Sequence, residues 1–349
     1  MITASIIFTL QKGGLKLWPD SGNFAHVQWW SIGLYLPLLI AATYFRAVRW
    51  RFLLRSIADI PLRRVLAVSW IGFAAILLMP FRLGEFVRPY MIRDNKGKLS
   101  MSAATGTVVA ERVVDGLYLS IVLAVALITV PHLEPLPATV VGLPVSVAAV
   151  RHSGFVMLGF FTTAFIVIGV YYFAREWARK VTLAVFGLVS KKLGEKLSGI
   201  AERLADGLHA FSRGRDAIGF LWETTLYWFF MVASMWALAW GCGVAHADGS
   251  AITFGETCAL MGMLSVAILI PGPPGLLGVF QAGIYAGMTM YFPTHVVIGE
   301  GAAYVFLLYL VQLVWTVIAA LIFLVGDRGA LKQLSSTDGD PGAERAAAS

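Results

Sequence analysis

Five apolar runs in this chain are each long enough to cross a lipid bilayer as a helix. A membrane-spanning helix needs about 20 mostly apolar residues, because each residue advances about 1.5 Å. The runs lie at residues 27–45, 103–130, 154–174, 218–244 and 299–325. Charged residues make up only 13% of the chain, about half of the share found in soluble domains. The sequence therefore predicts an all-α polytopic membrane protein, and the alternating pattern of a membrane β-barrel is missing.

Two further apolar segments, at about 65–80 and 256–271, are marginal in length, and each ends in a proline. A glycine-rich stretch follows each proline and then becomes apolar again. Interrupted segments of this kind are typical of broken or re-entrant helices. We therefore expect about five full spans and two re-entrant hairpins, which occupy residues 65–100 and 256–292.

The basic residues predict how the chain is threaded. They follow the first and third runs, in the segments 46–64 and 175–215, whereas the loops 131–152 and 245–256 carry almost none. The positive-inside rule places the basic segments, and with them the C-terminus, in the cytoplasm. The two interrupted segments then enter the plasma (inner) membrane from opposite faces. This arrangement predicts an inverted-topology repeat.

A single transmembrane domain is expected over residues 27–327. A short N-terminal segment, 1–26, precedes it, and a polar tail, 328–349, follows it and is predicted to be disordered and cytoplasmic. Within the domain we expect, in chain order, a first half at 27–130, a joining span at 154–174, a cytoplasmic amphipathic helix at 191–216 and a second half at 218–325. The amphipathic helix either contacts anionic lipid headgroups or packs on the bundle as a connector.

The two interrupted segments share a short sequence pattern. "PFRLGEF" (80–86) and "PGLLGVF" (274–280) both follow the spacing P-x-x-x-G-x-F. Transporters with inverted repeats bind substrate near mid-membrane, between their interrupted helices. The residues expected to line that cavity or to act as hinges are Pro80, Gly84, Pro271, Pro274, Gly275, Gly278 and Gln281.

Ionisable residues inside the apolar segments are the strongest candidates for a site. They are Arg82, Glu85, Arg88, Glu111, Arg112 and Asp115. A charge near the bilayer centre costs about 2.5 kcal/mol or more unless it is paired or hydrated. Glu111 and Asp115 share one helix face and repel each other, so we expect an arginine such as Arg88 or Arg82 to lie between them.

These charges allow two compatible interpretations. In the first, Arg88 with Glu111 and Glu85 with Arg112 form structural ion pairs that hold the interrupted element against the next helix. In the second, the same arginines bind an anionic headgroup, because intramembrane charge marks a functional site by default.

Other kinds of site receive little support. No metal-ligand spacing such as CxxC or HExxH occurs, so no metal or other cofactor is expected. Cys242 and Cys258 flank a short loop, and free thiols are favoured over a bridge. The net charge of +7 comes from basic residues beside apolar segments, which excludes nucleic acid as the expected partner.

Four segments together carry a family resemblance: "RAVRW" (46–50), "MPFRLGEFVRPYMI" (79–92), "VVAERVVDGL" (108–117) and "PGPPGLLGVFQAG" (271–283). In this order and spacing they resemble the flippase-like membrane family that includes the transmembrane region of lysylphosphatidylglycerol synthases. The resemblance runs from about residue 27 to 325. It implies an inner-membrane protein that moves a lipid or a lipid-linked headgroup between leaflets. The matching positions are Arg82, Gly84, Glu85, Arg88, Glu111, Arg112 and Asp115.

Two positions depart from that family's pattern. Gln281 stands where the family usually has a glutamate, and Leu310 stands where it tends to have an arginine. These departures predict that the charges of the site belong to the first half alone. No soluble aminoacyl-transfer domain is expected beyond Asp327, so lysyl transfer is not predicted.

The expected function is therefore a flippase-like transporter, not an enzyme, for an anionic phospholipid or a polyprenyl-linked lipid. One alternative is an intramembrane enzyme that acts on a lipid carrier, with Glu85 or Glu111 as base. Another is a non-transporting partner subunit of an envelope lipid-synthesis system. A homo-oligomer and an envelope-enzyme partner both remain open.

Overall fold

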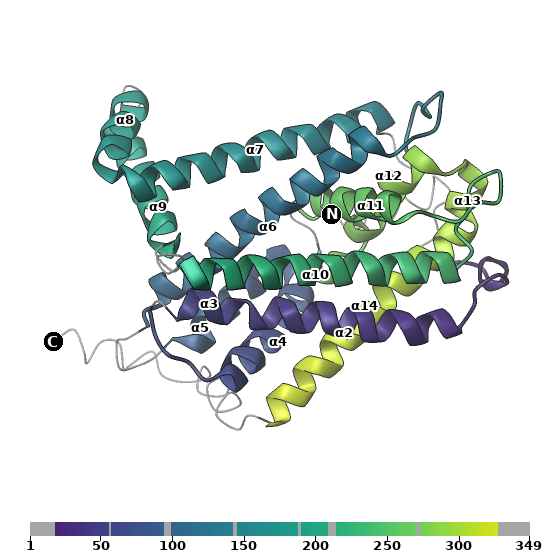
Figure 1. Ribbon diagram of the computed structural model, residues 1–349, viewed down its shortest axis with the longest axis horizontal. Coiled ribbons are helices and arrows are strands. Elements are labelled where there is room, and N and C mark those ends of the chain that lie inside the picture. The colour runs from purple at the N-terminus through teal and green to yellow at the C-terminus, as the bar shows by residue number, and fades with distance from the viewer. Residues whose placement is uncertain are drawn as a thin grey trace.

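The computed structural model describes residues 18–55, 57–93, 99–141, 145–187, 190–208, 214–269 and 273–326. Within these ranges the regular elements are all helices, and the long ones run between the two ends of an elongated bundle (Figure 1). The predicted all-α class is thus confirmed. Pro271, the tail 328–349 and residues 1–17 lie outside the described residues, as do the side chains of Pro80 and Arg82.

Four stretches of the described chain are long and apolar enough to cross a membrane, as a multi-pass protein requires. The first, Trp30–Leu54, joins α2 (Trp30–Val48) to α3 (Trp50–Leu54); the second and third are α6 (Met101–Thr129) and α7 (Val147–Phe173); the fourth, Thr294–Gly326, joins α13 (Thr294–Ile298) to α14 (Glu300–Gly326). The predicted first run, 27–45, ends too early. The helix continues through Arg46 and, after a short interruption, to Leu54, so Arg46 and Arg49 lie within the bundle and not in a loop.

The fifth predicted span forms α10 (Gly214–Gly241), a helix of 28 residues that lies beside α2 (Figure 1). The two helices are antiparallel, because Gly241 lies against Ser31 near one end and Gly219 lies against Phe52 near the other. The Trp, Tyr and Thr residues of α10 lower its mean hydropathy, so length and composition alone do not mark it as a span. Its crossing of the membrane stays a prediction.

The first interrupted segment folds into a helical hairpin. α4 (Leu62–Leu78) is followed by η2 (Pro80–Phe86) and α5 (Val87–Ile92), and both pack back on α4. Gly72 lies against Arg88, and Gly84 lies against Ala75, so residue numbers increase along α4 in the direction in which they decrease along the second arm. The arms are therefore antiparallel, and the turn lies near Met79.

The second interrupted segment forms a similar hairpin from α11 (Phe254–Ala267), η4 (Pro274–Leu276) and α12 (Val279–Tyr291). Gly283 lies 2.9 Å from the Cα of Leu264, and Gly287 lies 3.1 Å from the Cα of Leu260, when each distance is measured from an added Cβ. These glycines let the two arms approach closely, as the GxxxG spacing predicts.

The two hairpins enter the bundle from opposite ends (Figure 1), and their tips meet where η4 contacts η2 and α4. The chain passes along the long helices between the same two ends, with one hairpin in each half. This geometry agrees with the predicted threading, while the re-entrant placement in a membrane and the inverted repeat stay predictions.

Two helices, α8 (Arg175–Gly187) and α9 (Lys191–Leu208), follow α7. The sequence predicted one amphipathic helix over 191–216, because the apolar period continues past Leu208. The predicted helix is too long, since residues from Gly214 onwards belong to α10. α9 packs on α6, α7 and α8. Ser198 is buried there and accepts a hydrogen bond from the Tyr171 hydroxyl at 3.3 Å. These contacts favour the interpretation of α9 as a connector packed on the bundle.

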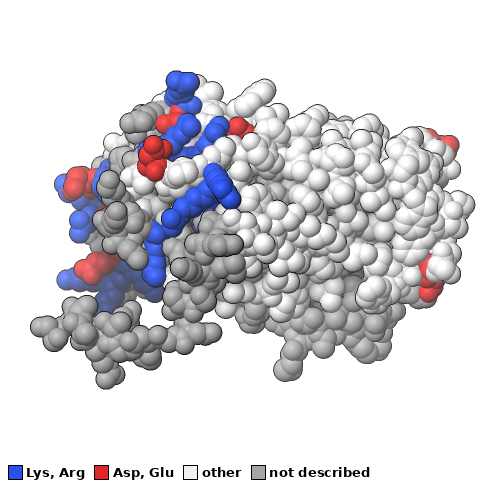
Figure 2. All heavy atoms as spheres, turned by 90° about the horizontal axis from the view of Figure 1, so that it is seen from below, with Lys and Arg blue, Asp and Glu red and all other residues white. Residues whose placement is uncertain are grey.

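The charged surface is strongly asymmetric. On the face shown in Figure 2, Lys and Arg side chains gather at the end of the molecule that holds α8 and α9, and only a few acidic residues appear at the opposite end. The last described residue, Gly326, lies at the basic end, where its carbonyl oxygen accepts a hydrogen bond from Arg63 at 3.0 Å. Cys242 and Cys258 are free, as predicted.

Candidate functional site

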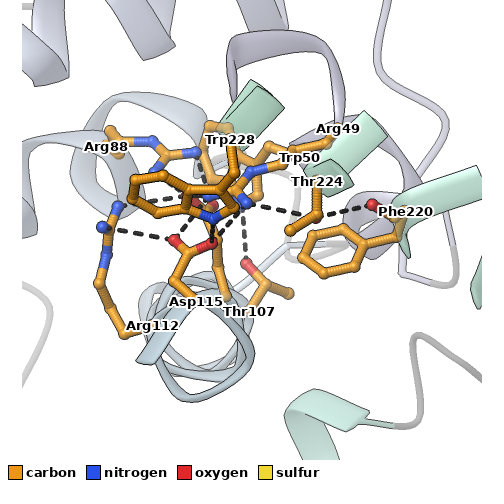
Figure 3. A network of polar contacts seen from close by, with 10 residues as sticks. Arg49, Trp50, Arg88, Thr107, Arg112, Asp115, Phe220, Thr224 and Trp228 are labelled. Atoms are coloured by element: carbon orange, nitrogen blue, oxygen red, sulfur yellow. Dashed lines mark hydrogen bonds and ion pairs between the residues drawn. The ribbon is translucent and has the colours of Figure 1, made fainter. Parts of the chain in front are cut away.

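Two carboxylates project from the middle of α6 into the core of the bundle. Glu111 is fully buried and Asp115 nearly so, and the two share a face because they are four residues apart. Glu111 lies roughly 15 Å along the helix from Met101, at 1.5 Å per residue. Arginines approach this face from several sides (Figure 3). A buried carboxylate without such partners would cost several kcal/mol.

Arg49, at the junction of α2 and α3, holds the two carboxylates together. Its Nη1 and Nη2 donate to Asp115 Oδ1 and Oδ2 at 2.6 and 2.7 Å, and Nη2 also donates to Glu111 Oε1 at 2.9 Å. The paired bonds to Asp115 have the fork geometry that makes arginine–carboxylate contacts strong. The expectation that Arg88 or Arg82 would lie between the carboxylates is therefore wrong for Arg88, because Arg49 occupies that place.

Arg88, in α5, binds Glu111 from another side. Its Nη2 donates to Oε2 at 3.1 Å and its Nη1 donates to Oε1 at 3.3 Å, which confirms the predicted pair. The guanidinium lies 4.2 Å from the centroid of the Trp50 ring. Gly72 of α4 makes room for it, because a Cβ at that position would collide with the Arg88 side chain. The pair thus fixes the first hairpin against α6.

Arg112 is the exposed member of this charge cluster. Its side chain is 24% exposed, whereas those of Arg49 and Arg88 are 0% exposed. Its Nη2 donates to Glu111 Oε1 at 3.2 Å, and its Nη1 lies 3.7 Å from Asp115 Oδ2. Arg112 is therefore anchored on one side and accessible on another.

Neutral side chains of α10 complete the cluster. Trp228 Nε1 donates to Asp115 Oδ1 at 3.3 Å, and the Thr224 hydroxyl accepts a bond from Arg49 Nη1 at 3.2 Å. Every carboxylate oxygen of Glu111 and Asp115 accepts at least one hydrogen bond. The cluster therefore ties α2, α5, α6 and α10 into one unit.

Replacing Thr224 with valine should lower the free energy of unfolding by about 1 kcal/mol, because Arg49 loses one acceptor in a buried site. Thermal unfolding of the purified protein in detergent measures the change. The matched control is Thr225→Val, on the exposed side of the same helix, which should have little effect. Equal shifts in the two variants would contradict a role for the Thr224 hydroxyl.

A cavity of about 500 Å³, here called the outer cavity, opens beside Arg112. It lies between the first hairpin, α6, α7, α10 and α11. Most of its lining is apolar, and its ionisable residues are Glu85, Arg112 and Asp115. A cavity of this size accepts a small organic molecule or part of a lipid. Its charge lies at one place, while the rest of the wall suits a hydrocarbon chain.

A second cavity of about 150 Å³, here called the inner chamber, lies where the two halves of the chain meet. The first hairpin contributes Ile76 and Leu77 to its wall, and the second contributes Leu276 and Phe280. Residues of α2, α6, α10 and α14 complete the wall. Three residues line both cavities, which therefore adjoin: Arg112, Trp228 and Ile268.

Four of the six predicted ionisable site residues come together in the cluster: Arg88, Glu111, Arg112 and Asp115. Glu85 lines the outer cavity together with Arg112. The side chain of Arg82 lies outside the described residues. The sequence missed Arg49 and Arg46, although both stand at the end of an apolar run and, three residues apart, share a helix face.

The predicted hinge residues that the structure describes in the second hairpin, Pro274, Gly275 and Gly278, lie at its turn and are not among the lining residues of the chamber. Gly275 and Gly278 have φ angles of 74° and 86°, which a residue with a Cβ rarely adopts. Pro274 is exposed, and the carbonyl oxygen of Gly275 accepts a bond from the Tyr309 hydroxyl at 2.8 Å. Gln281 is not among the lining residues of either cavity; its Oε1 accepts a bond from Gly278 N at 2.7 Å and caps α12.

Comparison with known families gives a match over most of the chain. The family model described as "Lysylphosphatidylglycerol synthase TM region" matches residues 22–320. The match spans both hairpins, the charge cluster and both cavities. None of the curated proteins and none of the solved structures that were compared with the chain matches it.

Proposed function

The chain belongs to the family of the lysylphosphatidylglycerol synthase transmembrane region, and on this premise we propose that it transports a membrane lipid. In this proposal an anionic headgroup binds at Arg112, and the lipid moves between the leaflets of the plasma (inner) membrane without chemical change. Family membership itself supports a role connected with membrane lipids.

The observation that carries this proposal is the position of Arg112. It is the partly exposed cation of an otherwise buried cluster, and it lies at the border of two cavities. A lipid needs a polar place for its headgroup next to an apolar place for its chains. The outer cavity offers both, because Arg112 stands in a mainly apolar wall.

The hairpins suggest how the site could be opened to either side. They enter from opposite ends of the bundle, and their tips meet beside the inner chamber (Figure 1). In our proposal they are re-entrant elements of an inverted-topology repeat, and movement of one half against the other gives alternating access. The basic end faces the cytoplasm, as the positive-inside rule predicts, so the C-terminus is cytoplasmic.

The charge cluster supports transport more than catalysis. Both oxygens of Glu111 accept hydrogen bonds from arginines, so Glu111 is poorly suited to accept a proton as a general base. We therefore assign the cluster to holding Arg112 in place and to binding, and not to a reaction.

Replacing Arg112 with glutamine should slow transport about 10- to 100-fold, since a hydrogen bond to a charged group contributes about 1.5–3 kcal/mol. The rate is measured in proteoliposomes with a tail-labelled phosphatidylglycerol and a leaflet-specific quencher. Arg112→Lys should retain part of the rate. The matched control is Arg93→Gln, which removes an exposed arginine stacked on Tyr90 at 4.1 Å.

Two results would contradict the proposed function. One is a wild-type protein that moves the labelled lipid no faster than protein-free vesicles do. The other is an Arg112→Gln variant that keeps the wild-type rate at equal reconstitution. Thermal unfolding of each variant separates a loss of transport from a loss of folded protein.

A further inference from the structure

Arg46 is a partly buried cation that the charge cluster does not use. Its guanidinium lies 4.2 Å from the centroid of the Phe73 ring and 5.7 Å from that of Tyr227. Its Nε is buried without a hydrogen-bond partner, and the side chain forms no hydrogen bond or ion pair with any group in the described part of the chain. Arg46 lines the inner chamber, so its donors are available to a molecule there.

The other polar groups around the inner chamber also suit an anion. Arg112 lines it from α6, and Gln312 lines it from α14. The Gln312 side-chain amide has no hydrogen bond to another described residue. Among the described residues of the chamber wall there is no Asp or Glu. The chamber therefore presents two guanidinium groups and an amide, and of the two guanidinium groups only that of Arg112 also pairs with carboxylates, those of Glu111 and Asp115.

The size of the chamber limits what it can hold. A cavity of about 150 Å³ holds benzene, a molecule of about six heavy atoms. A phosphate group, with about five heavy atoms, fits in this space, whereas a diphosphate or a sugar attached to a phosphate exceeds it. Because the chamber adjoins the outer cavity at Arg112 and Trp228, the rest of a larger molecule can remain there.

The described charged side chains around the two cavities carry an excess of one positive charge. The arginines described there are Arg46, Arg49, Arg88 and Arg112, and the carboxylates are Glu85, Glu111 and Asp115. Four positive charges against three negative ones leave an excess of one. An uncompensated charge at membrane depth is costly, and a phosphodiester carries the single negative charge that would neutralise it.

We infer that Arg46 and Arg112 form a phosphodiester-binding chamber between the two hairpins. The phosphate of a phospholipid enters the inner chamber, while its glycerol backbone and acyl chains stay in the outer cavity. This inference rests on the proposed function and narrows it, because it selects phospholipids with one phosphodiester over diphosphate-linked polyprenyl carriers.

Binding to the full chain in detergent tests the inference by isothermal titration calorimetry. Dioctanoyl phosphatidylglycerol is the phosphodiester probe, farnesyl diphosphate is the diphosphate probe, and inorganic phosphate tests for a site that takes the free ion. We expect wild-type protein to bind phosphatidylglycerol tightest. Arg46→Gln should raise its Kd about 10- to 100-fold, as expected when a charge-assisted hydrogen bond is lost, and Arg46→Lys should raise it less.

Two further variants make the test specific. Arg93→Gln removes an arginine that also lies over an aromatic ring, but outside the chamber, and should leave the Kd unchanged. Gln312→Leu removes the amide donor without touching a charge and should weaken phosphatidylglycerol binding several-fold. It tests the chamber independently if Arg46→Gln proves unstable.

Several outcomes would overturn the inference. One is that Arg46→Gln and Gln312→Leu both bind phosphatidylglycerol with wild-type affinity. Another is that farnesyl diphosphate binds the wild-type protein as tightly as phosphatidylglycerol does. The third is that inorganic phosphate binds as tightly as the lipid. The test separates this inference from the proposed function. Arg46-dependent binding without transport would reject only transport, and Arg112-dependent transport with Arg46-independent binding would reject only the chamber.

Discussion

Replacing Arg49 with leucine is expected to lower the free energy of unfolding by about 3–5 kcal/mol, the usual cost of removing one partner from a buried ion pair. Asp115 would lose both of its short bonds to a guanidinium, and Glu111 would lose one. Unfolding followed by tryptophan fluorescence in detergent measures the change. A total stability of about 5–15 kcal/mol is typical of a folded protein, so the yield of folded protein should also fall.

The matched control for this variant is Arg55→Leu. Arg55 also pairs with an aspartate, Asp216, but at 3.5 Å and with 46% of its side chain exposed. Exposed ion pairs contribute about 0–1 kcal/mol, because water screens them and the side chains lose entropy. A loss in Arg49→Leu no larger than that in Arg55→Leu would contradict the structural role of Arg49.

A double variant separates lost attraction from lost packing. Arg49→Leu combined with Asp115→Leu removes the buried carboxylate together with its main partner. Because replacing a whole buried pair with apolar side chains is often nearly neutral, the double variant should be more stable than Arg49→Leu alone. A double variant at least as unstable as the single one would show that the leucine at position 49 fails to pack and that unpaired charge is not the cause.

The sequence predicted most of the helical architecture because apolar length and basic flanks act locally. α6 and α14 lie within a few residues of the predicted runs, whereas the first helical stretch continues to Leu54 and α7 starts earlier than predicted, at Val147 and not at 154. Proline and glycine marked both interrupted segments, since these residues stop a helix whatever surrounds them. The extra helix α8 was missed because its basic residues were interpreted only as a cytoplasmic flank of the preceding span.

The site was predicted less completely, for a reason that concerns Arg46 and Arg49. An arginine at the end of an apolar run is ordinarily a cytoplasmic flank residue, and hydropathy cannot distinguish it from one that turns inward. The position of such an arginine depends on whether another helix carries carboxylates at the same depth. The sequence offered Arg82, Arg88 and Arg112 as partners for Glu111 and Asp115. Nothing in it therefore required a further arginine from the end of the first run.

The two halves are alike in their hairpins and unlike in their chemistry. Gly84 and Gly278 occupy the same place in the repeated pattern for different physical reasons. Gly84 is needed for close approach to α4, whereas Gly278 is needed for its positive φ. Gln281 caps its own helix, while the first half supplies the carboxylates and the arginines. The predicted concentration of charge in the first half agrees with these contacts.

Replacing Gly84 with alanine is expected to lower the free energy of unfolding by about 1–3 kcal/mol, the usual cost of overpacking. The added Cβ would collide with the backbone of Ala75 and Ile76, and a backbone cannot rotate away as a side chain can. The tip of the first hairpin would have to move from α4, carrying Glu85 with it and loosening its contact with η4. Lipid transport, measured as for Arg112, should therefore slow several-fold.

Gly159→Ala is the matched control, because no atom lies within 4 Å of a Cβ added there in α7. Alanine is a better helix former than glycine by about 0.5–1 kcal/mol, so this variant should be slightly more stable than the wild type and should transport at its rate. The two alanine variants should thus shift stability in opposite directions. If Gly84→Ala were as stable and as active as Gly159→Ala, the hairpin tip would not need its close contact with α4, and movement of that tip could not be the step that opens the site.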